Sequence, residues 1–188
     1  MSILFSLFAA SAVTAAAPDF VTEFSRTCAA SRSLAALNES VGKAGWRSIP
    51  NSEGTIAGVI AAVGPMLDAQ GLSSVYTTFA LDRNGRHFEL AVSETKKPMA
   101  DGHKLIGCSM YDFGASSPAD RQSIEALANG ATGQQSTLGD VSVEKWNNVH
   151  GAGSGMRAVF VPPNSQIKSQ LGFTGMMLGT HFLDGATN

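Results

Sequence analysis

The sequence is poor in charged residues, which make up 15% of its 188 positions against about a quarter in an ordinary globular protein. The formal net charge is −2, and the nearest approach to a basic cluster is the pair Lys96 and Lys97. Nucleic-acid binding and attachment to anionic lipid both need clustered cations, so the sequence predicts neither. With 44% apolar residues, the chain has the composition of a folded protein and the length of one domain.

Long apolar runs are also missing. Residues 3–17 form the longest uncharged apolar stretch, whereas a membrane-spanning helix needs about 20 residues. Small residues up to Ala15 or Ala17, followed by Pro18, are typical of the cleavage region of a secretory signal peptide. We therefore expect a signal peptide at 1–17, a periplasmic or secreted location and no stable membrane span after processing. A buried N-terminal helix is the alternative, because no Lys or Arg precedes the run.

Cysteine is scarce, with only Cys28 and Cys108 present. They have neither CxxC spacing nor a histidine pair beside them, so a metal site built on them would need ligands from elsewhere. In an oxidising compartment two cysteines of a small domain most often pair, and we predict the disulfide Cys28–Cys108. Two buried free thiols are the alternative.

Catalytic and metal-binding motifs are absent as well. Ser154 lies in the glycine-rich stretch 151–155, but its neighbours do not match G-x-S-x-G. The four histidines form no H-E-x-x-H pattern, and we predict no cofactor. His87 and His103 open adjacent predicted strands, so they are candidates for a metal site at one end of a sheet. Solvent-facing histidines at strand ends are the simpler interpretation.

The first half of the chain predicts two helices and a hairpin. Apolar residues at helical spacing indicate a helix from Asp19 to about Ala44 with Cys28 on its inward face. A shorter helix follows, with Pro65 predicting a kink or a division into two pieces. The Asn84-Gly85 turn then favours a β-hairpin. The ranges expected are 56–67 for the short helix, 73–81 and 87–95 for the hairpin strands, and 103–113 for a third strand.

The second half predicts a helix after Ser117, with Ile124 on its inner face, and then a loose segment at 129–140. Three more strands are expected at 141–146, 156–161 and 175–183, with one helical turn at 165–171. The fold class predicted is α+β: one domain at 18–188 with a single, mainly antiparallel sheet and helices packed on one face. A helix followed by three strands is expected twice, which is the pattern of an internal duplication.

One pattern resembles a known group of proteins. Cys28, Gly45-Trp46 and Cys108 form a Cys…Gly-Trp…Cys arrangement that resembles small exported proteins of alphaproteobacterial type, whose function is unknown. The resemblance implies export and a disulfide, and nothing about activity.

These observations together predict a non-catalytic exported domain that binds an unknown protein or small molecule in the cell envelope. A small periplasmic hydrolase is one alternative, although no catalytic residue is assigned. A metal-sequestering protein that uses the strand-end histidines is the other. An apolar pocket with a few convergent polar groups is the feature that a small-molecule site requires.

Overall fold

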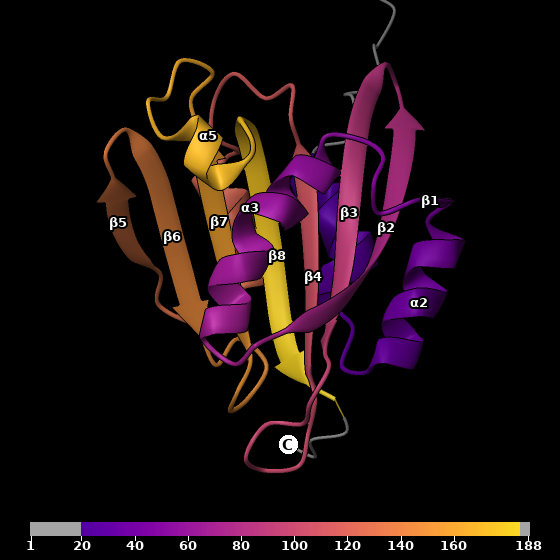
Figure 1. Cartoon of the computed structure of the whole chain (residues 1–188). Helices are drawn as coiled ribbons and strands as arrows, with labels where there is room; N and C mark the ends of the chain where they lie inside the picture. Colours follow the sequence, from indigo (N-terminus) through magenta and orange to yellow (C-terminus); the bar gives the residue numbers. More distant parts are fainter. Residues whose placement is uncertain (1–19, 185–188) are drawn as a thin grey trace, which may run out of the picture.

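The computed structural model describes residues 20–184, so the expected signal peptide at 1–17 lies outside the described residues. Within this range the chain forms one open sheet in which every neighbouring pair of strands is antiparallel (Figure 1). The strands are Arg47–Ile49 (β1), Ser74–Arg83 (β2), Arg86–Thr95 (β3), Leu105–Asp112 (β4), Gln134–Leu138 (β5), Val141–Asn147 (β6), Gly155–Val161 (β7) and Gly175–Leu183 (β8). The helices are Phe20–Phe24 (α1), the π-helix Ser25–Ala29 (η1), Leu34–Lys43 (α2), Ile56–Ala69 (α3), Arg121–Leu127 (α4) and Lys168–Leu171 (α5).

The sheet consists of two meanders that lie side by side. Its order is β1-β2-β3-β4-β8-β7-β6-β5, so β1 to β4 form one meander and β5 to β8 form the other. The last strand of each meander meets the other in the middle, where Cys108 on β4 lies opposite Thr180 on β8. The predicted α+β class and the single antiparallel sheet are therefore confirmed. The two edges of the sheet are β1 and β5, the first strand of each meander.

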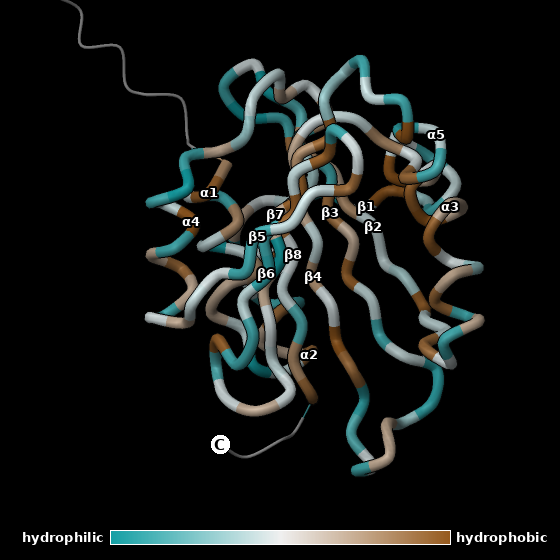
Figure 2. The backbone as a smooth tube through the Cα atoms, turned by 90° about the vertical axis from the view of Figure 1, so that its left-hand side faces the viewer, coloured by the Kyte–Doolittle hydropathy of each residue, from teal (hydrophilic) through white to brown (hydrophobic). Residues whose placement is uncertain are grey.

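Helices lie against both faces of the sheet, whereas the sequence analysis expected one covered face. The side view shows α1 and α4 on one side of the strands and α3 and α5 on the other (Figure 2). The buried apolar residues of α2 belong to the same hydrophobic cluster as those of α1 and α4. Two hydrophobic clusters correspond to these layers. On β3, Leu90 and Val92 belong to the α1–α2–α4 side, and Ala91 between them belongs to the α3–α5 side. The cluster on the α3–α5 side includes large residues such as Ile49, Tyr111 and Phe173, so this face of the sheet has a core of its own.

The expected helix from Asp19 to Ala44 is interrupted. The π-helix η1 follows α1 directly, and α2 begins anew after Ser33, whose side-chain oxygen accepts a hydrogen bond from Ala36 N at 3.2 Å. A serine that caps a helix start in this way favours a break, because it satisfies a backbone donor that a continuous helix would bond internally. Cys28 lies in η1 and is fully buried, as the helical pattern predicted.

The predicted hairpin is confirmed. Strands β2 and β3 pair along their whole lengths, from Ser74 opposite Thr95 to Arg83 opposite Arg86. Asn84 and Gly85 both have positive φ, at 51° and 76°, which is the turn conformation that the Asn-Gly sequence favours. The β8 range is also as predicted, and β4, β6 and β7 differ from the predicted ranges by one or two residues.

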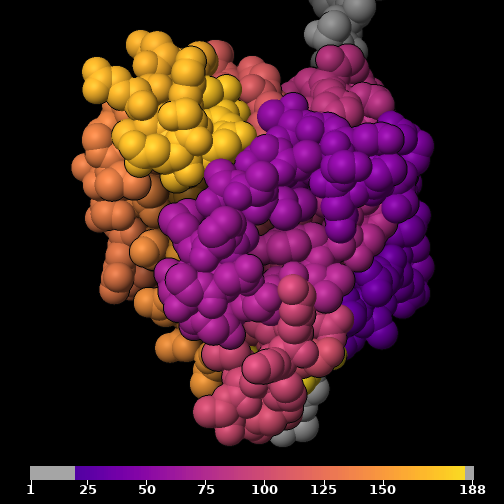
Figure 3. Space-filling model, in the orientation of Figure 1, coloured from indigo at the N-terminus to yellow at the C-terminus, as the bar shows by residue number. Residues whose placement is uncertain are grey.

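The helix α3 is continuous from Ile56 to Ala69, with Pro65 inside it. It lies on the surface of the molecule, crossing the face shown in Figure 3. Only Ile56 and Val59 among its residues are buried. The prediction of a helix here is confirmed, and the proline does not divide it.

The disulfide Cys28–Cys108 is confirmed. It joins η1 to the middle of β4, with a Cα–Cα distance of 5.7 Å and both residues fully buried. None of the helices within residues 20–184 is long and apolar enough to cross a membrane.

Candidate functional site

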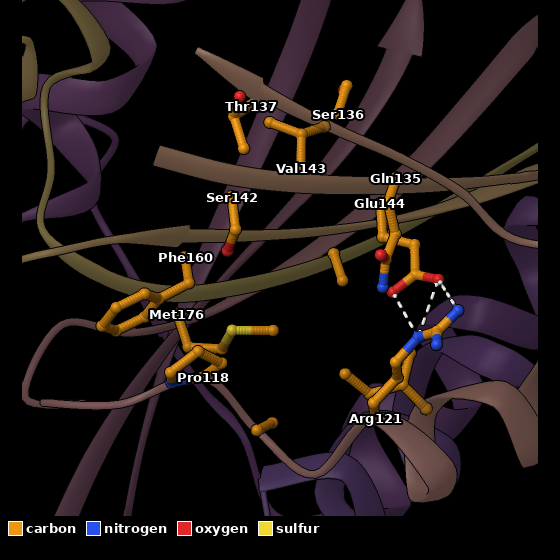
Figure 4. Close-up of a pocket in the computed structure, with 13 residues that line it drawn as sticks. Pro118, Arg121, Gln135, Ser136, Thr137, Ser142, Val143, Glu144, Phe160 and Met176 are labelled. Atoms are coloured by element: carbon orange, nitrogen blue, oxygen red, sulfur yellow. Dashed lines mark hydrogen bonds and ion pairs between the residues drawn. The ribbon is translucent and has the colours of Figure 1, made fainter. Parts of the chain in front are cut away.

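A cavity of about 520 Å³ lies between α4 and the β5–β8 meander. Its lining comes from the start of α4 and from four strands (Figure 4). The lining residues are Pro118, Ala119, Arg121, Ile124, Gln135, Ser136, Thr137, Ser142, Val143, Glu144, Ala158, Phe160 and Met176. The volume lies in the range of about 300–1,000 Å³ that is usual for small-molecule sites. The cavity is therefore the leading candidate for a ligand site.

The cavity exists because the helix above it is short and several lining residues are small. Helix α4 has seven residues, begun by Asp120, whose carboxylate accepts hydrogen bonds from Ser123 N at 2.8 Å and Ser123 Oγ at 2.6 Å. These hydrogen bonds, the one from the Ser123 hydroxyl first, lower the pKa of the Asp120 carboxyl. Beneath the helix, Ala158 and Ser142 offer little volume to fill the space.

One end of the cavity is charged and the other is apolar. Figure 4 shows Arg121 and Glu144 facing each other at one end, with Phe160, Met176 and Pro118 at the other. Arg121 Nη2 donates to Glu144 Oε1 at 2.9 Å, and Arg121 Nε donates to the same oxygen at 3.2 Å. A ligand with an apolar body and a hydrogen-bonding group would match this arrangement.

The ion pair between Arg121 and Glu144 includes a third residue, Glu125. Arg121 Nη2 also lies 2.8 Å from Glu125 Oε1, one helical turn further along α4. The hydrogen bonds with Glu144 raise the pKa of the Arg121 guanidinium, followed by the charges of Glu144 and Glu125. Glu144 and Glu125 therefore share a single guanidinium, so this end of the cavity carries an excess of negative charge.

Trp146 packs directly beside the charged end. It follows Glu144 by two residues on β6, is fully buried and is approached by Gly133. A Cβ atom on Gly133 would lie 2.5 Å from Glu144 Oε1 and 2.6 Å from Trp146 Nε1, so only glycine fits here. Among the described residues no partner accepts a hydrogen bond from Trp146 Nε1. The close approach of Gly133 fixes the chain immediately before β5.

The two histidines singled out as metal candidates do not meet. The pairing of β3 with β4 is antiparallel, with Glu89 opposite Tyr111 and Glu94 opposite Ile106, so the two strands begin at opposite ends of the sheet. His103 lies near the chain end, where its Nδ1 is 2.9 Å from the main-chain oxygen of Asp184. Within residues 20–184 no group of three or more His, Cys, Asp or Glu side chains is placed to hold a metal ion.

His87 instead belongs to a cluster of carboxylates at the end of the β2–β3 hairpin. Its Nδ1 lies 2.6 Å from Asp82 Oδ1, and its Nε2 lies 3.2 Å from Glu89 Oε1. Glu89 is buried and accepts hydrogen bonds from Thr55 N at 3.0 Å and Ile56 N at 2.8 Å, at the first turn of α3. A carboxylate is favourable there because the N-terminus of a helix carries partial positive charge. The cluster therefore attaches α3 to the sheet.

Ser154 has its hydroxyl engaged within its own loop. Its Oγ donates to the Gly151 carbonyl at 2.7 Å and accepts from His150 N at 2.9 Å. The side chain thus closes the turn between β6 and β7. These contacts explain the serine without any chemical reaction.

Neither the cavity nor strand β5 was predicted from the sequence. Residues 134–138 have no apolar alternation, so they read as part of a loose segment. The available signal was indirect, in small residues such as Ala158 within an apolar strand. Small residues on a strand indicate a cavity only when the position of the helix packed against that strand is known. The helix predicted to start at Ser117 begins at Arg121 instead, because the Asp120 side chain caps it by accepting a hydrogen bond from Ser123 N.

The chain was compared with protein-family models, with curated proteins and with solved structures, and none of the three comparisons finds a match.

Proposed function

We propose that this protein is a non-catalytic binding domain that acts outside the cytoplasm, in the periplasm or after secretion, and that the cavity under α4 is its ligand site. The observation that carries the proposal is the cavity itself, which combines a volume of about 520 Å³ with an apolar interior and one polar end. Its ligand is an uncharged, mainly apolar group, because Arg121 already has carboxylate partners in Glu144 and Glu125.

Two features support action outside the cytoplasm. The buried disulfide Cys28–Cys108 suits an oxidising compartment, where such bonds form and persist. The uncharged apolar residues 3–17, ending in small residues, suit a signal for export. The resemblance of the Cys…Gly-Trp…Cys pattern to small exported proteins agrees with both.

The first test is the uptake of a neutral fluorescent probe, N-phenyl-1-naphthylamine, by the purified protein. The probe is apolar and becomes bright when it leaves water, so a saturable rise in fluorescence reports the cavity. We expect Ser142→Phe to weaken probe binding at least tenfold, because Ser142 lines the cavity and a phenyl ring there occupies it. The size of this effect follows from the loss of about 1.4 kcal/mol or more of binding free energy.

Lys145→Phe is the matched control. Lys145 is exposed, lies three residues further along β6 and has its side chain on the opposite face of the sheet, as strand alternation requires. The variant adds the same ring to the same strand away from the cavity, so probe binding should stay within twofold of the wild type. Failure of the wild type to take up the probe, or equal weakening by both variants, would overturn the proposal.

A further inference from the structure

The outer edge of β5 is open. All five residues of the strand are exposed, including Leu138 with 57% of its surface accessible, and nothing among the described residues pairs with its outer side. The strand contains no charge, proline or glycine. Natural sheets usually protect an edge with short strands, charges or proline.

The opposite edge is protected in this way. Strand β1 has three residues, carries Arg47 and is followed at once by Pro50. A second strand can therefore be added to this sheet at β5 far more easily than at β1. The contrast between the two edges indicates that the unprotected edge of β5 has a function.

The open edge of β5 also lies beside the cavity. Strands β5 and β6 are joined by the two-residue turn Gly139-Asp140, with Leu138 opposite Val141. In such a hairpin the closing pair is hydrogen-bonded and the pairs alternate, so the main-chain N–H and C=O of Gln135 and Thr137 point outward. The side chains of these two residues line the cavity. A strand added to β5 thus places its own alternate side chains beside the cavity.

We infer that the ligand of this cavity is the side chain of an extended polypeptide that pairs antiparallel with β5. The inference rests on the proposed function and names its partner class. Main-chain hydrogen bonds to Gln135 and Thr137 hold the peptide in place, and an apolar side chain of the peptide enters the space between α4 and the sheet. This is recognition by strand addition, in which the backbone supplies affinity and a pocket supplies specificity.

The charges around the cavity define the partner further. Glu125 and Glu144 share the single cation Arg121, so the peptide that fits has basic residues beside its apolar ones. A second copy of this chain fits less well. Its own β5 would place Gln135 and Thr137 over the cavity, and these polar side chains would leave an apolar space unfilled.

The test uses a fluorescein-labelled peptide of nine residues in which leucine alternates with threonine and a lysine stands at each end. We expect saturable binding by fluorescence anisotropy, and displacement of N-phenyl-1-naphthylamine by the unlabelled peptide. A peptide with glutamate at each end should bind at least threefold more weakly. Because paired residues of antiparallel strands share a face, N-methylation of the leucines should abolish binding and N-methylation of the threonines should preserve it.

Thr137→Pro tests the edge from the side of the protein. It removes one outward-facing N–H without removing a hydrogen bond between β5 and β6, and edge strands tolerate proline at such positions. Thr137→Val is the matched control, because both variants change the side chain beside the cavity and only the proline lacks the N–H. We expect the peptide to bind at least tenfold more weakly to Thr137→Pro than to Thr137→Val.

The possible outcomes separate the two proposals. Probe uptake without peptide binding overturns strand addition and leaves the proposed function standing, whereas failure of both overturns both. Equal binding of the two N-methylated peptides also overturns strand addition. Wild-type dimers in analytical ultracentrifugation that Thr137→Pro makes monomeric, together with no peptide binding, would assign the edge to a second copy instead.

Discussion

At the scale of single residues, two carboxylates in contact with His87 influence the charge of its imidazole. The hydrogen bond with Asp82, the largest effect, raises the pKa of His87, burial opposes this, and the Glu89 contact adds to it. Protonated His87 therefore stabilises the folded state. This contribution is complete below the ordinary histidine pKa of about 6.5 and is lost as the pH rises through the higher folded-state pKa.

We predict that His87 titrates at a higher pH than His150 and His181 in an NMR titration of the imidazole signals. Burial lowers the pKa of His150 and of His181, with a further contribution from Arg32 for His150 and from Arg157 for His181. Asp82→Asn should lower the pKa of His87 by removing its strongest partner. An unchanged His87 titration in Asp82→Asn would show that the 2.6 Å contact does not control it.

The contacts of individual residues could be predicted from the sequence to different degrees. Cys28 and Cys108 were paired correctly because only one intramolecular pairing exists. The position of His87 at a strand end is as predicted, but its partners were not predicted. Asp82 lies opposite His87 across the hairpin, and Glu89 lies two residues further along β3 on the same face. The burial of Glu23 could not be predicted from the sequence. This residue is fully buried because Arg83, sixty residues away, donates to its two carboxylate oxygens at 2.7 and 2.8 Å.

At the scale of elements, α3 contains a proline that a helix interior does not favour. Pro65 has no N–H to donate to the preceding turn, and its ring crowds the backbone there, at a cost of about 3 kcal/mol or more. Replacement by alanine also makes the unfolded chain more flexible, which offsets up to about 1 kcal/mol of the gain. We predict that Pro65→Ala raises the free energy of unfolding by about 2 kcal/mol, measured by urea denaturation.

Pro50→Ala is the control for this prediction. Pro50 is exposed and stands outside the helices, directly after β1. The substitution increases the flexibility of the unfolded chain without restoring a helical hydrogen bond, so stability should fall by about 0.5–1 kcal/mol. A stability loss in Pro65→Ala as well would mean that the bend imposed by the proline is needed where α3 packs on the sheet.

Elements with their own hydrophobic pattern were predictable, and elements defined by their neighbours were not. The β2–β3 hairpin and β8 carry alternating apolar residues and turn signals, and their positions are as expected. Strand β5 has no apolar pattern because both of its faces are exposed, and its structure comes from main-chain pairing with β6. The cavity lies between α4 and this unpredicted strand, so the candidate site could not be predicted from the sequence either.

At the scale of the whole molecule, one covalent bond connects the layers of the fold. Cys28 lies in η1, within the helical layer, and Cys108 lies in the middle of the sheet beside the junction of the two meanders. The bond closes a loop with a sequence separation of 80 residues. That loop encloses α2, β1, α3 and the β2–β3 hairpin, so its closure restricts nearly the whole first half of the unfolded chain.

We predict that reduction with dithiothreitol lowers the free energy of unfolding by about 4.5 kcal/mol, the loop-closure entropy of a chain of this length. Urea denaturation with and without the reductant measures the difference. The double variant Cys28→Ala/Cys108→Ala is the control, because it has no bond to break and should respond to the reductant not at all. Equal stability of the oxidised and reduced wild type would mean that the buried contacts around η1 hold the helical layer on the sheet unaided. In that case the disulfide would lose its value as support for a protein built to work in an oxidising compartment.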